Sequence, residues 1–139
     1  MPYVLDTDTV SAFQYRNRDV VARVRAQPDS EIFVTIVTLQ EQMAGQLSVL
    51  NRQLKPDALI TAYDELLRTS AFYGTANVLR YDAAAARIEN DLRKNLRRMG
   101  TFDRRIAAIT LAHGHTLVTR NTVDFRDVPG LGLEDWMAS

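Results

Sequence analysis

One run of residues constrains the fold of this chain more than any other: residues 32–37, with the sequence IFVTIV. β-Branched and aromatic residues dominate it, which predicts a β-strand. Its apolar side chains would point to both faces of a sheet. We therefore expect a central strand of a parallel sheet that helices cover on each side.

Shorter apolar runs and helical patterns alternate along the rest of the chain. The other expected strands are residues 3–5, 78–79, 116–119 and 131–133. The expected helices are one or two short ones within residues 10–24 with Asp19 as a cap, one from Thr38 that Pro56 breaks, one from there to about Gly74, one from Asp82 that Gly100 closes, and one from about residue 101 to a turn at Gly114. This alternation predicts an α/β fold with helices on both faces of a parallel sheet. The length of 139 residues predicts a single domain over residues 1–139.

The two middle helices carry apolar residues at spacings of three and four, which predicts buried faces. In the first helix these residues are Leu39, Met43, Leu47, Leu50 and Leu54. In the second they are Ile60, Tyr63, Leu66 and Leu67, which we expect to point inward. Near the end of the chain, we expect Trp136 to fill the core or its rim.

Composition excludes several classes of protein. The chain has no cysteine, which excludes disulfide scaffolds and thiolate metal sites and fits a reducing compartment. No apolar run approaches the roughly 20 residues that span a bilayer, and the beginning, MPYVLDTD, lacks the pattern of a secretory signal. We therefore expect a cytoplasmic protein without a membrane partner. The 17 basic and 17 acidic residues balance, which argues against a general polyanion binder.

Four acidic residues occupy similar places in the expected fold. Asp6 ends the first strand, Glu41 lies in the first turn of the helix after the second strand, and Asp124 follows the fourth strand. In an open α/β sheet the carboxyl ends of the strands line one edge, so we expect these three acids to converge there. Asp103 lies in the first turn of the helix that precedes the fourth strand, and that rule does not place it directly.

Each acid also has an ordinary structural explanation. Thr38 and Glu41 could form a capping box, and Asp6 and Asp8 could cap the next helix. Asp103 could stabilise the start of its helix, and Asn121 and Asp124 could be ordinary turn residues. Four caps that converge by chance are less economical than one site. Gathered carboxylates repel one another unless a cation neutralises them. An all-oxygen set of ligands without His or Cys predicts Mg²⁺, with Mn²⁺ as the second possibility.

Three segments that contain these acids resemble a known family. LDTD near the beginning, VTIVTLQEQMAG after the second strand, and GTFDRRIAAITLAHGHTLVTRNTVDFRDVPGLGLEDW at the end resemble PIN-domain proteins, and more narrowly VapC-type toxins of type II toxin–antitoxin pairs. The resemblance implies a three-layer α/β sandwich with about five parallel strands. It also implies a Mg²⁺-dependent ribonuclease that is held inactive by a VapB-like antitoxin and that forms a homodimer.

The resemblance carries over to individual positions. Asp6, Glu41, Asp103 and Asp124 match the family's acidic positions, and we expect them to hold the metal and carry catalysis. Asn121 stands where many relatives have another Asp, and Asp8 stands where Asn is common, which leaves the number of metal ions open. We expect Thr7, Asp8 and Asn121 to contact the metal ligands and orient them. We expect four arginines to attract the RNA backbone: Arg97, Arg98, Arg104 and Arg105.

Two other readings of the same residues stay open at this point. The segment Asp6-Thr7-Asp8-Thr9-Val10 fits the D-x-D-x-[TV] pattern of haloacid dehalogenase-like phosphatases, in which Asp6 would be the nucleophile. Against it, the only lysines are Lys55 and Lys94, and neither is expected at the end of a strand, where it would contact phosphate. The third possibility is a catalytically silent PIN-like domain that binds RNA or protein.

Overall fold

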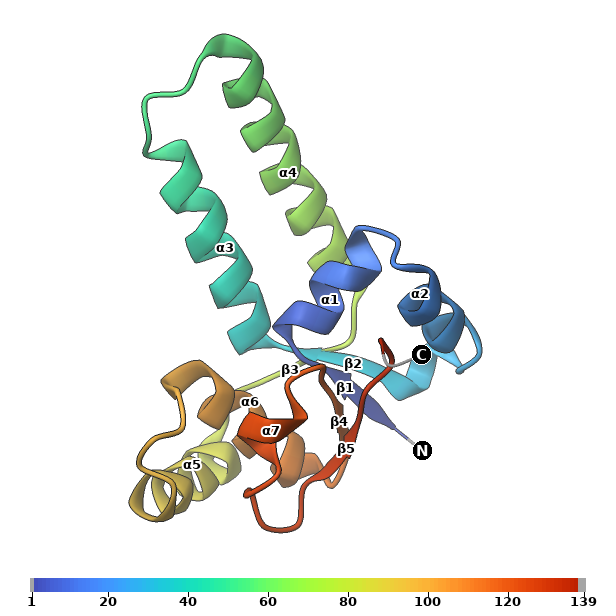
Figure 1. The fold of residues 1–139 in the computed structure, drawn as a ribbon, viewed down its shortest axis with the longest axis vertical. Coiled ribbons are helices and arrows are strands. Elements are labelled where there is room, and N and C mark those ends of the chain that lie inside the picture. Colours follow the sequence, from blue (N-terminus) through green and yellow to red (C-terminus); the bar gives the residue numbers. More distant parts are fainter. Residues whose placement is uncertain (1, 138–139) are drawn as a thin grey trace.

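The computed structural model describes residues 2–137, and its centre is one parallel sheet of five strands (Figure 1). The strands are β1 (Tyr3–Leu5), β2 (Ile32–Thr35), β3 (Val78–Leu79), β4 (Thr116–Val118) and β5 (Gly132–Glu134). Their order is β3-β2-β1-β4-β5, and every neighbouring pair is parallel. The sequence predicted all five strands, including the two-residue β3.

Hydrophobic side chains fill both faces of the sheet. On one face, Leu5 and Val118 pack with Val10 of α1 (Thr7–Gln14), Val20 of α2 (Arg18–Arg25) and the buried Trp136. On the other face, strand residues pack against α5 (Ala83–Asn95) and α6 (Thr101–His113). Successive strand residues point to opposite faces, so β1 contributes Val4 to the second cluster and Leu5 to the first. The predicted three-layer α/β sandwich and the core position of Trp136 are confirmed.

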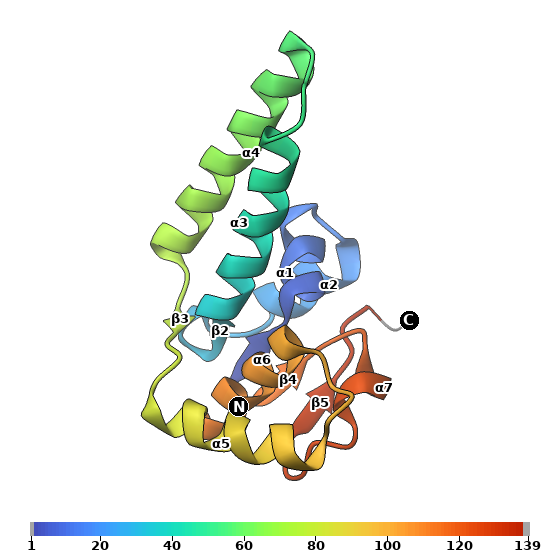
Figure 2. The same cartoon turned by 90° about the vertical axis from the view of Figure 1, so that its left-hand side faces the viewer.

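A long helical hairpin extends beyond this sandwich (Figures 1 and 2). It consists of α3 (Ile36–Leu50) and α4 (Pro56–Thr75). The prediction that its apolar residues face inward is wrong for several of them. Exposed hydrophobic side chains on the hairpin include Met43, Leu47, Leu59, Ile60, Tyr63 and Leu67. The physical reason is length, because the 20 residues of α4 extend about 30 Å whereas the four residues of β2 extend only about 13 Å.

The beginning of α3 differs from the prediction. β2 ends at Thr35, and residues 36 and 37, which were expected in the strand, already belong to the helix. Thr35 is the N-cap, and its hydroxyl oxygen accepts a hydrogen bond from the Thr38 N–H at 3.1 Å. A capping box of Thr38 with Glu41 is therefore wrong, and Glu41 lies in the second helical turn rather than in the first.

Other boundaries follow from local capping. Asn17, not Asp19, caps α2, because its side chain accepts from two backbone N–H groups. Asp82 caps α5 as predicted, but α5 ends at Asn95, and Gly100 is the N-cap of α6 rather than the end of the helix before it. Gly114 closes α6 with a φ of 67°, the left-handed conformation that favours glycine. The remaining elements are the single 3-10 turn Asp29–Glu31 and the short α7 (Thr122–Phe125). Among residues 2–137, no helix has both the length and the apolar character that a bilayer crossing needs.

Candidate active site

Asp6 lies at the carboxyl end of the central strand. Its N–H donates to the Val118 carbonyl at 3.0 Å, which ties it to the end of β4. The chain leaves β1 toward β2 on one side of the sheet and later places β4 on the other side. Open α/β sheets have a crevice at such a reversal, outside the carboxyl ends of the strands. Asp6 therefore stands at the point where this fold most readily forms a site.

Helix α6 brings Asp103 to the same edge. The helix runs antiparallel to β4, which it precedes, so its first turn lies at the carboxyl edge of the sheet. Its 13 residues extend about 20 Å, twice the roughly 10 Å of the three-residue strand. Asp103 is the third residue of the helix. The antiparallel direction of the helix thus supplies the placement that the rule for strand ends did not give.

Electrostatics show that the acids converge. The pKa of Asp103 is raised to about 6, first by burial and then by the charges of Glu41, Asp6, Asp124 and Asp8, in that order. All four acids chosen from the sequence therefore lie in one electrostatic field, together with Asp8. Among residues 2–137 no ion pair reaches any of them.

Asp6 is buried, with 6% of its surface exposed, and it combines two roles. Its Oδ1 accepts from the Thr9 N–H at 2.9 Å, so it is the N-cap of α1. Burial raises the pKa of Asp6, and hydrogen bonds from Thr119 and Thr9 oppose that rise. The capping explanation is therefore correct for Asp6, and it does not remove this acid from the cluster.

Threonine hydroxyls hold Glu41 in place. The Thr7 hydroxyl donates to Glu41 Oε1 at 2.6 Å and lies 3.2 Å from the hydroxyl of Thr38. That hydroxyl lies 3.4 Å from the hydroxyl of Thr35, at the end of β2. The structure thus places Thr7 behind an acid, as expected. Sequence reasoning missed Thr35 and Thr38 as supports, although threonines at a strand end beside an acid were a visible signal.

Asn121 plays the corresponding part for Asp124. Its side-chain amide donates to Asp124 Oδ2, and its own N–H donates to the Thr119 hydroxyl at 2.9 Å. Thr119 is fully buried and also bonds Asp6, so it connects Asp6 through Asn121 to Asp124, a role that the sequence did not reveal. Asp124 is exposed in α7 rather than in an open loop. Asp8 is exposed on the first turn of α1.

The four arginines do not form one rim. Arg97 and Arg98 are exposed in the turn between α5 and α6. Arg104 is buried, and its Nε donates to Glu89 Oε2 at 2.9 Å. It does not face the surface, so the expectation that it steers RNA is wrong. Arg105 is half-buried, and its Nε donates to Glu89 Oε1 at 3.3 Å.

The residues present suit a hard divalent cation. All the side-chain groups in the cluster are oxygen donors, which Mg²⁺ and Mn²⁺ prefer. Their mutual repulsion, visible at Asp103, is the charge that such a cation offsets. Within residues 2–137, no three acids or histidines stand close enough to hold a metal as they are. Binding would therefore require the acidic side chains to close in on the ion.

Comparison with known sequences gives a consistent result. The model of the PIN domain matches residues 3–131. The chain is 30% identical over 141 aligned positions to a tRNA(fMet)-specific endonuclease VapC of Shigella flexneri, with 98% of each chain covered. It is 31% identical over 133 positions to Ribonuclease VapC1 of Rickettsia felis, with 94% of this chain and 93% of that protein covered.

A solved structure has the same fold. The crystal structure of DNA-bound VapBC from Salmonella typhimurium matches with a TM-score of 0.80 and 25% sequence identity, and the match covers 98% of each chain. The similarity therefore includes the projecting hairpin as well as the sheet.

Proposed function

Because this chain belongs to the PIN-domain family and is a VapC-type toxin, we propose that it is a Mg²⁺-dependent ribonuclease acting within a toxin–antitoxin pair. One observation carries the proposal: the pKa of a half-buried carboxyl, Asp103, is raised to about 6 by burial and by the charges of the acids around it. Unless a cation is bound, that arrangement costs stability. Relatives that are named endonuclease and ribonuclease support RNA as the substrate.

The chain's own residues would divide the work as follows. Asp6, Asp103, Asp124 and Glu41 would hold Mg²⁺, or Mn²⁺ in its place. When bound, such an ion lowers the pKa of a coordinated water and offsets charge on the phosphate. Thr7 fixes the carboxylate of Glu41, and Asn121 fixes that of Asp124. Because Asp103 must lose its proton to become a ligand, Mg²⁺ competes with that proton, and Mg²⁺ binding should weaken as the pH falls below the metal-free pKa of about 6.

RNA cleavage with and without the metal tests this proposal. We expect the purified protein to hydrolyse a single-stranded RNA in Mg²⁺ and to stop in EDTA, and we expect Asp103→Asn and Asp6→Asn each to lower hydrolysis at least about 100-fold. Asp64→Asn is the matched control, because Asp64 is an exposed acid on α4 away from the cluster. Full activity in folded Asp103→Asn and Asp6→Asn proteins would contradict the assignment. RNA binding without cleavage in any metal would support the silent binding domain instead. Membership of the PIN family removes the support for the phosphatase reading of the DTDTV segment.

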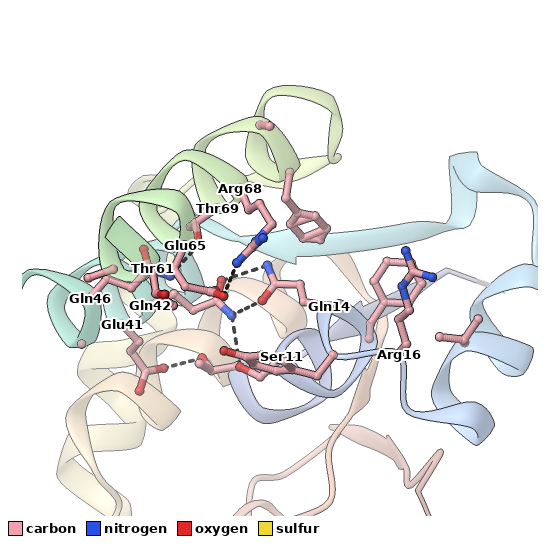
Figure 3. A pocket seen from close by; sticks show the side chains of 18 of the residues that line it. Ser11, Gln14, Arg16, Glu41, Gln42, Gln46, Thr61, Glu65, Arg68 and Thr69 are labelled. Atoms are coloured by element: carbon pink, nitrogen blue, oxygen red, sulfur yellow. Dashed lines mark hydrogen bonds and ion pairs between the residues drawn. The ribbon is translucent and has the colours of Figure 1, made fainter. Parts of the chain in front are cut away.

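A groove beside the acids supports the antitoxin part of the proposal (Figure 3). It has a volume of about 1680 Å³ and lies between α1, α2, α3 and α4. Its wall includes Thr7 and Glu41, so an occupant would lie directly next to the catalytic acids. Gln42 lines the groove, and its amide donates to Gln14 Oε1 at 2.8 Å and to the Ser11 hydroxyl at 3.1 Å. We place the VapB-like antitoxin segment in this groove.

Two glycine variants test that placement. Gly45 lines the groove and has no atom within 4 Å of the place where a side chain would begin, so the side chain of Gly45→Trp would start in open space and take up part of the groove. We expect this variant to cleave RNA but to escape inhibition by the small protein encoded next to its gene. Gly74→Trp is the control, since Gly74 is equally open and lies outside the groove. Normal inhibition of Gly45→Trp would place the antitoxin elsewhere.

We also propose that the protein forms a homodimer in the cytoplasm. Exposed apolar residues of the hairpin, among them Leu47, Ile60 and Leu67, support a dimer surface, since large apolar patches mark contact sites. The 15 residues of α3 include one charge, Glu41, so two copies would meet there with little charge repulsion. Sedimentation equilibrium should find a dimer that Leu47→Glu with Leu67→Glu converts to a monomer. A wild-type monomer at high concentration would contradict the dimer.

A further inference from the structure

A second hollow lies on the other side of α3 from the antitoxin groove. It measures about 360 Å³ and is lined by Ile36, Val37, Gln40, Tyr81 and Arg105. The groove is lined by different residues of α3, among them Gln42, Gly45 and Gln46. In the chain, Gln40 precedes the active-site acid Glu41, and Arg105 follows Asp103 by two residues. The hollow therefore lies on the same parts of α3 and α6 as two of the acids, but it is lined by other faces of these helices.

One buried carboxylate fixes two walls of this hollow. Glu89 accepts hydrogen bonds from the Tyr81 hydroxyl and from the Nε atoms of Arg104 and Arg105. Within residues 2–137 the bond to Arg105 uses only Nε, so no hydrogen bond in this part of the chain occupies the two terminal nitrogens of that guanidinium. Tyr81 keeps 39% of its surface exposed although its hydroxyl is bonded. The hydroxyl end of the ring is thus fixed by a hydrogen bond while part of the residue is open to solvent.

The lining suits a flat, polar-edged molecule. The Tyr81 ring is a stacking surface, and Ile36, which is 41% exposed, adds an apolar contact. The Gln40 side chain is exposed and carries both a donor and an acceptor, as hydrogen bonding to a base edge requires. Arginine guanidinium planes also stack on bases and bind phosphate. Aromatic stacking combined with edge hydrogen bonds is how proteins recognise unpaired RNA bases.

We propose that this hollow binds one nucleobase of the RNA substrate, near the phosphate that is hydrolysed at the acidic cluster. Tyr81 stacks on the base, Gln40 bonds its edge, and Arg105 contacts the same nucleotide. Glu89 is a positioning residue that orients Tyr81 and Arg105. The subsite rests on the proposed ribonuclease function and adds a determinant of which nucleotide is accepted.

Substitution of Tyr81 tests the subsite by kinetics. On an oligoribonucleotide that spans a cleavage site mapped with the wild-type protein, Tyr81→Ala should raise KM about tenfold or more and leave kcat nearly unchanged. Tyr81→Phe keeps the ring and loses only the bond to Glu89, so its KM should stay within a few-fold of wild type. This pair separates stacking from a general loss of structure. Tyr63→Ala is the control, because Tyr63 is an exposed tyrosine on α4 outside both cavities.

Removal of bases tests the same subsite from the RNA side. Copies of that oligoribonucleotide, each with one abasic position, should include one that wild type binds about tenfold more weakly than the intact RNA. Tyr81→Ala should bind that abasic copy and the intact RNA equally, because the loss of ring and the loss of base remove the same contact. Binding is measured in proteins that also carry Asp103→Asn, so that the RNA stays intact.

The outcomes separate the subsite from the ribonuclease function. If wild type cleaves RNA while Tyr81→Ala keeps its KM, or if the losses of ring and base add independently, the subsite is wrong and the ribonuclease stands. If wild type cleaves no RNA in Mg²⁺ or Mn²⁺, both proposals are wrong.

Discussion

Glu89 and Asp103 are carboxyl groups on two helices packed against each other, and their surroundings are opposite. Burial by itself would raise the pKa of Glu89, but the Tyr81 hydroxyl and the charges of Arg104 and Arg105 outweigh it, and the net pKa is lowered. For Asp103, burial and four neighbouring acids act in the same direction and raise the pKa to about 6. One acid is supplied with counter-charges by the fold, and the other is deprived of them.

The difference between the two acids distinguishes a structural carboxylate from a functional one. Glu89 is satisfied by the protein and stabilises the packing of α5 on α6. The negative charge of Asp103 stays uncompensated until a cation binds from solution. Groups that lower stability in this way are typical of functional sites. Because no positive charge of the protein neutralises these carboxylates, we expect their ligand to be a cation.

The largest expected effect is on catalysis. Asp103→Asn should lower RNA hydrolysis by about 100- to 1000-fold, because a bound metal contributes several kcal/mol to the stabilisation of the transition state. Glu89→Gln should leave kcat close to wild type. Single-turnover cleavage of one RNA by both variants measures this contrast. Equal loss of kcat in the two variants would erase the proposed distinction between the acids.

The next largest effect is on stability, and here we expect the loss at Glu89 rather than at Asp103. Glu89→Gln should lower the free energy of unfolding by about 3 kcal/mol, because it leaves the buried Arg104 without its counter-charge. Urea denaturation measures this, with Glu65→Gln as the matched control. Glu65 pairs with the exposed Arg68, so its loss should cost no more than about 1 kcal/mol. An equal loss of free energy of unfolding in both variants would show that the buried ion pair stabilises the protein no more than the exposed one.

Loss of a supporting hydroxyl should have a smaller effect on catalysis. Thr7→Val keeps the shape of the side chain and removes the hydrogen bond to Glu41. We expect about tenfold weaker Mg²⁺ binding or activity, as for other residues that orient metal ligands. Thr75→Val, at an exposed threonine on α4, should behave as wild type. Unchanged Mg²⁺ affinity in Thr7→Val would remove Glu41 from the set of ligands.

The smallest effect is a stabilisation that depends on pH. In EDTA at pH 7.5, Asp103→Asn should raise the free energy of unfolding on the order of 1 kcal/mol after solvent screening is allowed for. The folded-state pKa is raised to about 6, so wild type is destabilised only where Asp103 is ionised. As the pH falls through 6 toward 4, folded Asp103 takes up a proton that the unfolded chain does not yet bind, and wild type gains stability. The advantage of the variant should therefore vanish near pH 4, and an advantage independent of pH would refute the repulsion.

Sequence patterns predicted the five strands from apolar runs, and Asp6, Glu41 and Asp124 from their places at or after strand ends, whereas the family resemblance was needed to assign Asp103 to the cluster. Sequence patterns failed where the outcome depends on length or partners in space. The exposed Ile60 and Tyr63 have the spacing of a buried face, and only the shortness of the sheet leaves them uncovered. Arg104 looks like Arg98 in sequence, and only Glu89, fifteen positions away, shows that it is buried. Thr35 and Thr38 were missed as supports because a threonine between a strand and a helix has the same pattern as an ordinary helix cap.

The titration of the Asp103 carboxyl by NMR, with and without Mg²⁺, tests the central claim most directly. In metal-free protein the pKa should be about 6, and saturating Mg²⁺ should lower it to or below the ordinary value of about 4. Glu89 serves as the internal reference, since Mg²⁺ should not move its pKa. If Asp103 titrates near 4 without metal and does not respond to Mg²⁺, the four acids do not form a cation site.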